Sequence, residues 1–403
     1  MTDKLKILVS ASNMGGCSYY RVLMPFEKLQ ELYPDEVEVR FNLNPLGFDT
    51  DHKFMRPGLP NDGWLPDWDF EDMKWADVIV TNNLSNYGPN YTARIVGKAK
   101  EFGKFVIYDT DDLLTNLYEG HRLFHVYKQR QLDKVAEFVY NHADLVTVTQ
   151  PKFLKRIAKY CGNSVAMVRN AIDYNLPCWN NDPIPASKNK KRNKTYVRFG
   201  WVGGIHHEQD LKYFAGVPHM VNQKVGRENC RWDFYGHPHP QQQDYQWQAD
   251  VWRNYQNMLT SGFRGGKNWH IHYATHPHLY GSFYASMDVA LAPLEPNEFN
   301  DSKSEIKLAE AGRYGVPLIA SDVGCYSDWI VNGKNGFLID PKKGVSEWVR
   351  VLTRVAKDHD LRRSMGENLR ELVNEKFDIN KTSRARLDMI QETYKQWKEG
   401  QGS

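Results

Sequence analysis

The segment K-F-V-I-Y-D-T-D-D-L-L, residues 104–114, begins with a short apolar run and continues into three aspartates. The run is rich in β-branched and aromatic residues and has no polar residue between its apolar ones. Such a run is typical of a strand covered by helices on both faces of a parallel sheet. The aspartates therefore follow the carboxyl end of a predicted strand, the edge at which parallel sheets place their ligand sites.

Similar runs lie along the whole chain and alternate with helical patterns. The strands predicted in the first half are 7–9, 37–43, 77–81, 104–108 and 144–149. Those predicted in the second half are 196–202, 231–236, 269–273, 288–293, 316–321 and 336–340. This order predicts an α/β protein with two Rossmann-like, doubly wound domains that face an interdomain cleft.

A polar tract rich in proline, asparagine and lysine separates the two series of strands and is typical of a linker. A length of 403 residues also favours two domains. We expect an N-terminal Rossmann-like domain over 1–175, a linker over 176–195 and a C-terminal Rossmann-like domain over 196–375. We expect the last segment, 376–403, to form a helix that packs back on the N-terminal domain.

Composition excludes several classes of protein. The chain has 52 Lys and Arg against 49 Asp and Glu, a net charge of +3, so it does not coat nucleic acid or membrane by charge alone. Its five cysteines are scattered without C-x-x-C spacing, which argues against a disulfide framework or a zinc site. The apolar part of the N-terminus is too short for a signal peptide, and no apolar run is long enough for a transmembrane helix. We expect a soluble, cytoplasmic protein.

A second segment, F-N-D-S-K-S-E-I-K-L-A-E-A-G at 299–312, combines two lysines and two glutamates. Ser302 and Glu305 have the spacing of a capping box, which predicts that a helix begins there. Lys303, Lys307 and Glu310 would then share one helical face beside a positive helix end.

That face suits an anionic ligand. Free backbone N–H groups and two lysines would bind a diphosphate, and Glu310 would accept hydrogen bonds from ribose hydroxyls. The alternative is an ordinary solvated surface with salt bridges. Gly203 and Gly204 follow the predicted strand 196–202 and would let the backbone approach a phosphate closely, which favours the ligand site.

The chain resembles family 4 glycosyltransferases of the GT-B fold. The resemblance rests on the segments V-R-N-A-I-D (168–173), G-W-V-G-G (200–204), D-V-A-L-A-P-L (288–294), K-L-A-E-A-G-R-Y-G-V-P-L-I-A-S (307–321) and N-G-K-N-G-F-L-I (332–339). The opening I-L-V-S-A-S-N-M-G-G is similar to the family's first strand and loop. The resemblance implies sugar transfer from a nucleotide diphosphate sugar, a UDP-sugar by expectation, with retention and without a metal or cofactor.

The family's E-x7-E motif is incomplete in this chain. Glu310 matches its second glutamate, which in the family binds the ribose, but the first falls on Ser302. Asn300, Asp301 or Ser302 could replace the missing glutamate, or the donor sugar could be unusual.

The family's basic loop after the first strand of the donor domain also differs. His206 and His207 stand there instead of Arg and Lys, so Lys303 and Lys307 would supply the charge on the diphosphate. We predict donor binding by Gly203, Gly204, His206, Ser302, Lys303, Lys307 and Glu310.

In the first domain, Asp109, Asp111 and Asp112 lie near the predicted cleft. Asp111 and Asp112 could orient the acceptor hydroxyl or take its proton, or one of them could cap a helix. His121 and His125, one helical turn apart, could present a ring to the donor sugar, as a first-domain histidine does in the family.

The loop after the first strand supplies the remaining candidates. We predict acceptor or phosphate contacts from Gly15, Gly16, Tyr20 and Arg21. The H-x-H pairs at 237/239, 270/272 and 276/278 lack a completing cysteine or carboxylate, so no metal site is predicted.

The acceptor stays open at this point. A glycan, a protein side chain or a hydroxymethylated DNA base are all compatible with the chain, and K-N-K-K-R-N-K (188–194) could contact DNA phosphates or be a solvated linker. A non-catalytic module that binds a nucleotide sugar or a glycan is the alternative to an enzyme.

Overall fold

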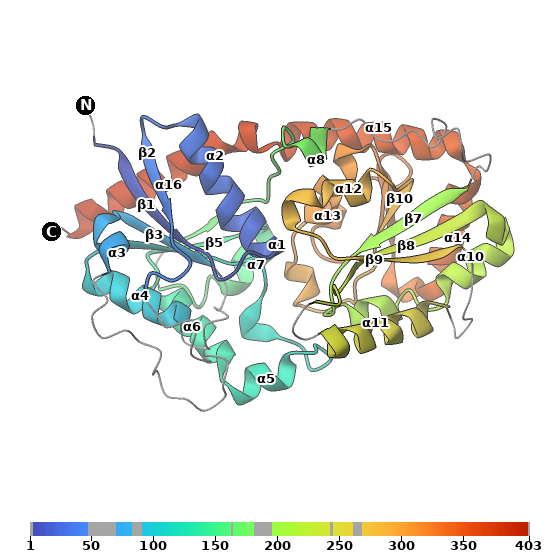
Figure 1. Ribbon diagram of the computed structural model, residues 1–403, viewed down its shortest axis with the longest axis horizontal. Coiled ribbons are helices and arrows are strands. Elements are labelled where there is room, and N and C mark those ends of the chain that lie inside the picture. Colours follow the sequence, from blue (N-terminus) through green and yellow to red (C-terminus); the bar gives the residue numbers. More distant parts are fainter. Residues whose placement is uncertain are drawn as a thin grey trace.

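The chain folds into two α/β halves, each built on one six-stranded parallel sheet (Figure 1). The structure is a computed structural model that describes residues 3–46, 70–82, 91–162, 164–180, 196–241, 245–260 and 268–401. The predicted fold class is confirmed. In the described part, no helix is long and apolar enough to cross a membrane.

The N-terminal sheet has the order β2-β1-β3-β4-β5-β6. Its strands are β1 (Leu5–Ser10), β2 (Val37–Phe41), β3 (Val78–Asn82), β4 (Phe105–Asp109), β5 (Leu145–Val148) and β6 (Ser164–Met167). All five residues of β4 are buried, as the uninterrupted apolar run predicts. Phe105 and Ile107 join the apolar cluster on one face of the sheet, and Val106 and Tyr108 join the cluster on the other.

Helices and turns of the N-terminal half cover both faces of this sheet (Figure 1). They are α1 (Gly16–Ser18), the π-helix η1 (Tyr19–Leu23), α2 (Met24–Leu32), α3 (Glu71–Trp75), α4 (Tyr91–Glu101), the 3₁₀ turn η2 (Leu114–Asn116), α5 (Phe124–Gln129), α6 (Leu132–His142) and α7 (Pro151–Ile157). The short helix α8 (Pro177–Asn180) lies against the C-terminal half, where its buried Trp179 joins the same cluster as Tyr284. The five-residue π-helix is notable because such turns are rare and occur often at functional sites.

The C-terminal sheet has the order β12-β11-β10-β7-β8-β9. Its strands are β7 (Val197–Val202), β8 (Cys230–His237), β9 (Trp269–Tyr273), β10 (Val289–Ala292), β11 (Leu318–Ser321) and β12 (Gly336–Ile339). The chain runs outward from β7 to β9 and then returns to the other side of β7 with β10. The strand order therefore reverses between β7 and β10, where doubly wound sheets open a crevice for ligands.

The helices of the C-terminal half are α9 (Glu208–Lys212), α10 (Val217–Val225), α11 (Tyr245–Thr260), α12 (Gly281–Tyr284), α13 (Ile306–Arg313), α14 (Gly344–Lys357) and α15 (His359–Lys376). The last helix of the chain, α16 (Ile379–Gln401), packs on the N-terminal half. Short 3₁₀ turns occur at η3 (Arg227–Asn229), η4 (Pro277–Leu279), η5 (Asn300–Ser302), η6 (Tyr326–Asp328) and η7 (Pro341–Lys343).

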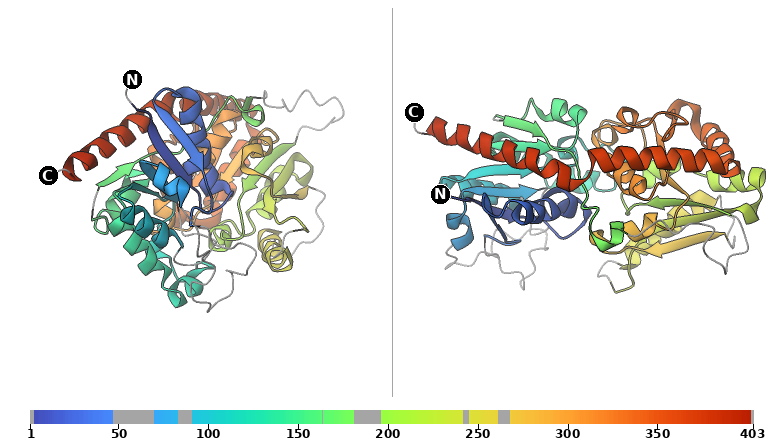
Figure 2. Two further views of the ribbon diagram at one scale, coloured as in Figure 1. Left: turned by 60° about the vertical axis from the view of Figure 1, so that its left-hand side comes forward. Right: turned by 90° about the horizontal axis from the view of Figure 1, so that it is seen from above.

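The last two helices connect the halves. Figure 2 shows α15 along the C-terminal half and α16 continuing along the N-terminal half. Leu387 and Ile390 of α16 are buried in the same cluster as Ile7 and Val9 of β1. The buried Arg386 of α16 donates a hydrogen bond to the carbonyl oxygen of Arg21. The C-terminal end of the chain is thus part of the N-terminal core.

Candidate functional site

The loops that follow β7 and β10 meet loops of the N-terminal half that follow β1 and β4. Two contacts join them directly. The Lys303 ammonium lies 3.5 Å from Asp112 Oδ1. The rings of His121 and His206 stack, with centroids 5.6 Å apart and an interplanar angle of 13°. The candidate site is therefore an interdomain cleft at the switch point of the C-terminal sheet.

The predicted capping box is wrong. Helix α13 begins at Ile306, and the Glu305 side chain does not cap it. Ser302 lies in the turn η5, where its hydroxyl donates to the Glu298 carbonyl oxygen at 2.8 Å. The Glu305 carboxylate instead accepts a hydrogen bond from Arg169 at 3.1 Å. Lys303 consequently lies on an extended stretch before the helix rather than on its face.

Lys303 is held between a ring and a carboxylate. Its ammonium lies 4.7 Å from the centre of the Phe299 ring, in addition to its contact with Asp112. Burial alone would lower its pKa, but the charges of Asp112 and then Asp210 outweigh burial and raise it. Lys303 therefore carries a full positive charge into the cleft at neutral pH.

Lys307 lies in the first turn of α13, with its ammonium 5.5 Å from the centre of the Trp201 ring. Burial lowers the pKa of Lys307 to about 8, with the charge of Asp210 opposing the shift and the charge of Lys303 adding to it. Two lysines and the N–H groups at the start of α13 thus gather positive charge at one place.

The two glycines after β7 differ in what they permit. A Cβ at Gly203 would lie 2.3 Å from a ring atom of Trp201, so a side chain there would displace the indole. A Cβ at Gly204 would meet nothing within 4 Å. Gly203 is therefore required by packing, whereas Gly204 leaves exposed backbone at the cleft.

The cleft histidines are neutral. His207 Nδ1 lies 2.7 Å from Asp210 Oδ2, yet burial and the charge of Lys307 lower the pKa of His207 to about 4. Burial, followed by the neighbouring His206, lowers the pKa of His121 to about 4. At neutral pH they offer hydrogen bonds and ring faces, and the lysines provide the charge.

Asp210 organises this side of the cleft, and the sequence analysis missed it. Its Oδ1 accepts hydrogen bonds from the Asn300 side chain at 2.7 Å and from the Glu295 backbone at 2.8 Å, while Oδ2 faces His207. The signal in the sequence was its position three residues after His207, at the start of a helix. The loop after β10 is fixed to the loop after β7 through this one carboxylate.

Glu310 is enclosed by two tyrosines. The Tyr20 hydroxyl donates to Glu310 Oε1 and the Tyr284 hydroxyl to Oε2, each at 2.7 Å. Glu310 is only 4% exposed, and burial raises its pKa. Tyr20 belongs to the π-helix of the N-terminal half, so this contact spans the two domains. A predicted acceptor residue and a predicted donor residue are therefore direct partners.

The E-x7-E motif is not confirmed, because none of the three candidate replacements for its first glutamate faces the cleft. The Asn300 amide is bound to Asp210 and to the Glu295 carbonyl. Asp301 Oδ2 pairs with Arg156 at 2.6 Å and Oδ1 with Lys152 at 3.0 Å. Ser302 is fully buried and accepts a hydrogen bond from Arg156.

The three aspartates after β4 separate into two environments. Asp109 is buried and forms two hydrogen bonds with the Arg21 guanidinium, at 2.8 and 2.7 Å. Burial, followed by the charge of Asp112, raises the pKa of Asp111 to about 6. Neither Asp111 nor Asp112 caps a helix, because the N-cap of η2 is Leu113. Asp111 and Asp112 are therefore the carboxylates at the cleft.

Cys17 lies beside this pair. Ligand atoms of Cys17, Asp111 and Asp112 are all within 4.8 Å of one another, the one such group of three among the residues that the structure describes. The charge of Asp111 raises the pKa of the Cys17 thiol. A thiol and two carboxylates can hold a divalent cation, so a metal-free site stays a prediction. The Lys303 ammonium already supplies positive charge to Asp112.

The loop after β1 contributes less than predicted. Gly15 donates its N–H to Asn13 Oδ1 at 2.7 Å, and Gly16 faces the Tyr280 ring. Arg21 is buried against Asp109, the Val168 carbonyl and Asn170. Its charge is neutralised inside the N-terminal half, so its predicted acceptor contact is wrong.

Other predicted features lie elsewhere. His125 is on α5, whereas His121 precedes that helix, so the two are not on one helical face. His272 Nε2 lies 2.6 Å from Asp233, and the rings of His276 and His278 are 4.1 Å apart. No H-x-H pair joins a third metal ligand within the described ranges. The basic tract 188–194 lies outside the described residues.

Comparisons with known proteins match part of the sequence and the whole fold. Residues 197–358 match the family model of "Glycosyl transferases group 1". CapM, a capsular polysaccharide biosynthesis glycosyltransferase of Staphylococcus aureus, is 31% identical over 98 residues, which is 24% of this chain and 24% of that protein.

Solved structures resemble the whole chain. Sucrose-phosphate synthase from Thermosynechococcus elongatus has a TM-score of 0.67 at 15% identity, covering 97% of this chain and 99% of that one. Anabaena HepE, in complex with UDP and glucose, has a TM-score of 0.65 at 13% identity, covering 96% of this chain and all of that one. Residues 197–358 are therefore similar to the glycosyl transferases group 1 family, and the whole chain has the two-domain GT-B fold of these structures.

Proposed function

We propose that this chain transfers a sugar from a nucleoside diphosphate sugar to an acceptor hydroxyl in the interdomain cleft. The observation that carries the proposal is the convergence of Lys303, Lys307 and the first turn of α13 beside the exposed backbone of Gly204. Two cations, a positive helix end and an unobstructed glycine match the charge of a diphosphate. HepE, which has the same fold, is described with UDP and with UDP-glucose, which supports a UDP-sugar donor.

Each domain has a part in the reaction. Lys303 and Lys307 would neutralise the charge that develops on the diphosphate as the glycosidic bond breaks. Asp111 and Asp112, on the opposite wall, would orient the acceptor hydroxyl and receive its proton, and the pKa of Asp111 near 6 suits that exchange. By resemblance to its family, the enzyme would act with retention and without a metal.

Glu310 would bind the ribose from its buried place in α13. Both of its oxygens already accept a tyrosine hydroxyl, so ribose hydroxyls would share these oxygens or replace the Tyr20 hydroxyl. Replacement is the more direct route, because Tyr20 comes from the other domain and leaves when the domains separate.

A donor panel tests the proposed function. We expect mass spectrometry to detect sugar transfer or slow donor hydrolysis with one nucleotide sugar among UDP-, GDP-, ADP- and TDP-sugars. Lys303→Ala and Lys307→Ala should each reduce turnover by roughly a hundredfold, as expected for removal of a charge that stabilises a leaving group. Lys342→Ala, an exposed lysine of the same domain, should change nothing. Binding of a donor without any turnover would instead identify a non-catalytic binding module.

A further inference from the structure

A hollow of about 330 Å³ opens between the domains next to the stacked pair His121 and His206. Its walls come from residues 119–125 of the N-terminal half and 206–209 of the C-terminal half. Figure 1 shows the segment before α5 extending across to the C-terminal half, close to α11. The hollow therefore shares His121 and His206 with the cleft of the proposed reaction.

The side chains that line this hollow carry more negative than positive charge. Arg122 is the one Arg or Lys among its lining residues, and it pairs with Glu208 at 2.6 Å. Glu119 adds an exposed carboxylate, and Gln209 adds an amide that donates to the Gly120 carbonyl oxygen at 3.3 Å. Phosphate groups would meet two carboxylates and one neutralised arginine, whereas sugar hydroxyls would find several hydrogen-bonding partners.

An exposed tryptophan stands beside the hollow. Trp247 of α11 is 46% exposed, and the Arg122 guanidinium carbon lies 5.5 Å from the centre of its ring. Because Arg122 contacts both Glu208 and Trp247, the ring adjoins the polar wall. A sugar ring has an apolar face of C–H bonds and a rim of hydroxyls. Its apolar face can stack on an exposed aromatic ring while its hydroxyls form hydrogen bonds with neighbouring carboxylates and amides.

We propose that this hollow, together with Trp247, binds an uncharged sugar ring of a glycan acceptor. The proposal rests on the proposed function and names the class of its acceptor. It places the acceptor chain across the outer end of the cleft, with the reacting hydroxyl directed inward toward Asp111, Asp112 and Lys303. The carboxylates of Glu119 and Glu208 would repel DNA or any other anionic acceptor.

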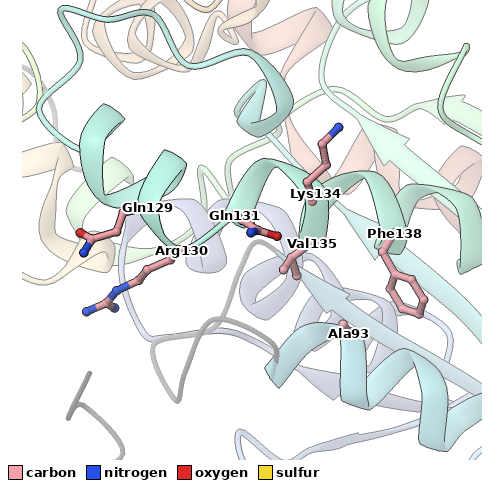
Figure 3. A pocket seen from close by; sticks show the side chains of 7 residues that line it. All are labelled: Ala93, Gln129, Arg130, Gln131, Lys134, Val135 and Phe138. Carbon is pink, nitrogen blue, oxygen red and sulfur yellow. The ribbon is translucent and has the colours of Figure 1, made fainter. Parts of the chain in front are cut away.

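A second hollow has the opposite chemistry and provides the control. It measures about 440 Å³ and is lined by residues of α4, α6 and the end of α5, including Arg130, Lys134 and Phe138. Figure 3 shows Val135 and Phe138 directed toward Ala93, with Arg130 on the other side. All of its lining residues belong to the N-terminal half, and none is a candidate site residue. Its lining has two cations, of which Lys134 pairs with Glu137 at 2.8 Å, and no carboxylate. A polyanionic acceptor would therefore favour this hollow over the first one.

The test measures binding to a glycan array of neutral and anionic oligosaccharides and to single-stranded DNA, with UDP affinity measured separately by calorimetry. We expect a neutral oligosaccharide to bind the full-length protein. Trp247→Ala should weaken that binding at least tenfold, as for other exposed aromatic anchors, and leave UDP affinity unchanged. Trp247→Phe should retain most of it, and Arg130→Ala with Lys134→Ala should bind like the wild type. Circular dichroism confirms that each variant is folded.

Three outcomes would overturn the proposal. The first is that no neutral glycan binds, and the second is that Trp247→Ala binds a neutral glycan as tightly as the wild type does. The third is that only anionic glycans or DNA bind, and that the Arg130→Ala, Lys134→Ala variant abolishes this binding. If UDP and nucleotide sugars bind and turn over in any of these cases, the proposed function stands and only the acceptor class is wrong. If no nucleotide sugar binds or reacts, the proposed function itself fails.

Discussion

Lys307 has a pKa of about 8, so its charge changes within an accessible pH range. The protonated form is the one that binds a diphosphate, and it is lost as the pH rises through 8. Its neighbour Lys303 keeps its charge over this range because Asp112 and Asp210 raise its pKa. One of the two cations at the proposed diphosphate site is therefore sensitive to pH and the other is not.

We predict that UDP affinity falls roughly tenfold between pH 7 and pH 9, because the loss of one proton is coupled to the loss of one ionic contact. Calorimetric titrations at several pH values measure this slope. Lys307→Arg is the matched variant, since a guanidinium stays charged throughout this range. The slope should flatten in Lys307→Arg. An equal slope in both proteins would show that another group titrates.

At the scale of elements, the loop of η5 that leads to Lys303 is fixed by the other domain. Lys152 and Arg156 of α7 pair with Asp301, and Gln150 donates to the Asp301 carbonyl oxygen at 2.7 Å. In the next part of the loop, the Asn170 side-chain amide donates a hydrogen bond to the Ser304 hydroxyl at 2.8 Å. The residues at the position of the missing glutamate thus hold the loop in place instead of facing the cleft.

We predict that Asp301→Asn weakens UDP binding by roughly tenfold, because the loop that positions Lys303 loses its ionic partners. Arg156→Gln should have a similar effect, and the double variant should be no worse than either single one, as expected for two residues in one network. Glu347→Gln breaks an exposed ion pair on α14 and serves as the control, with no change expected. Fully additive effects of Asp301→Asn and Arg156→Gln would contradict this role.

The elements of the fold were largely predictable because each strand is an uninterrupted apolar run, such as 105–108, and such runs have few alternative structures. The start of α13 was not. Ser302 and Glu305 have the spacing of a capping box, but partners distant in sequence, Arg156 and Arg169, bind both side chains. A local pattern does not reveal such competition. The lysines and Gly204 were each predicted from a pattern within one short segment, 299–312 or 200–204, and their role in donor binding stays a prediction.

At the scale of the whole molecule, contacts between the domains were invisible in the sequence. Tyr20 and Glu310 are 290 positions apart, and nothing in either segment indicates the other. Arg21 was predicted to contact the acceptor or a phosphate from the loop after the first strand. Its true partner, Asp109, lies 88 positions away. Breaking such a buried pair costs about 3–5 kcal/mol of folding stability. Arg21 therefore stabilises the fold of the N-terminal half.

The Tyr20–Glu310 hydrogen bond makes the relative position of the domains testable. Tyr20→Phe removes a buried bond to a carboxylate that spans the domains, a loss of roughly 1.5–3 kcal/mol. Tyr284→Phe removes the equivalent bond within the C-terminal half, since Tyr284 lies on α12 and Glu310 on α13. We predict that both variants lower the melting temperature.

Only Tyr20→Phe should increase the radius of gyration in small-angle X-ray scattering, because of the two variants only Tyr20→Phe removes a contact between the domains. Saturating UDP should reduce that increase if the nucleotide bridges Lys307 and the N-terminal wall. An unchanged radius of gyration in Tyr20→Phe, or an equal increase in Tyr284→Phe, would show that this hydrogen bond does not hold the domains together.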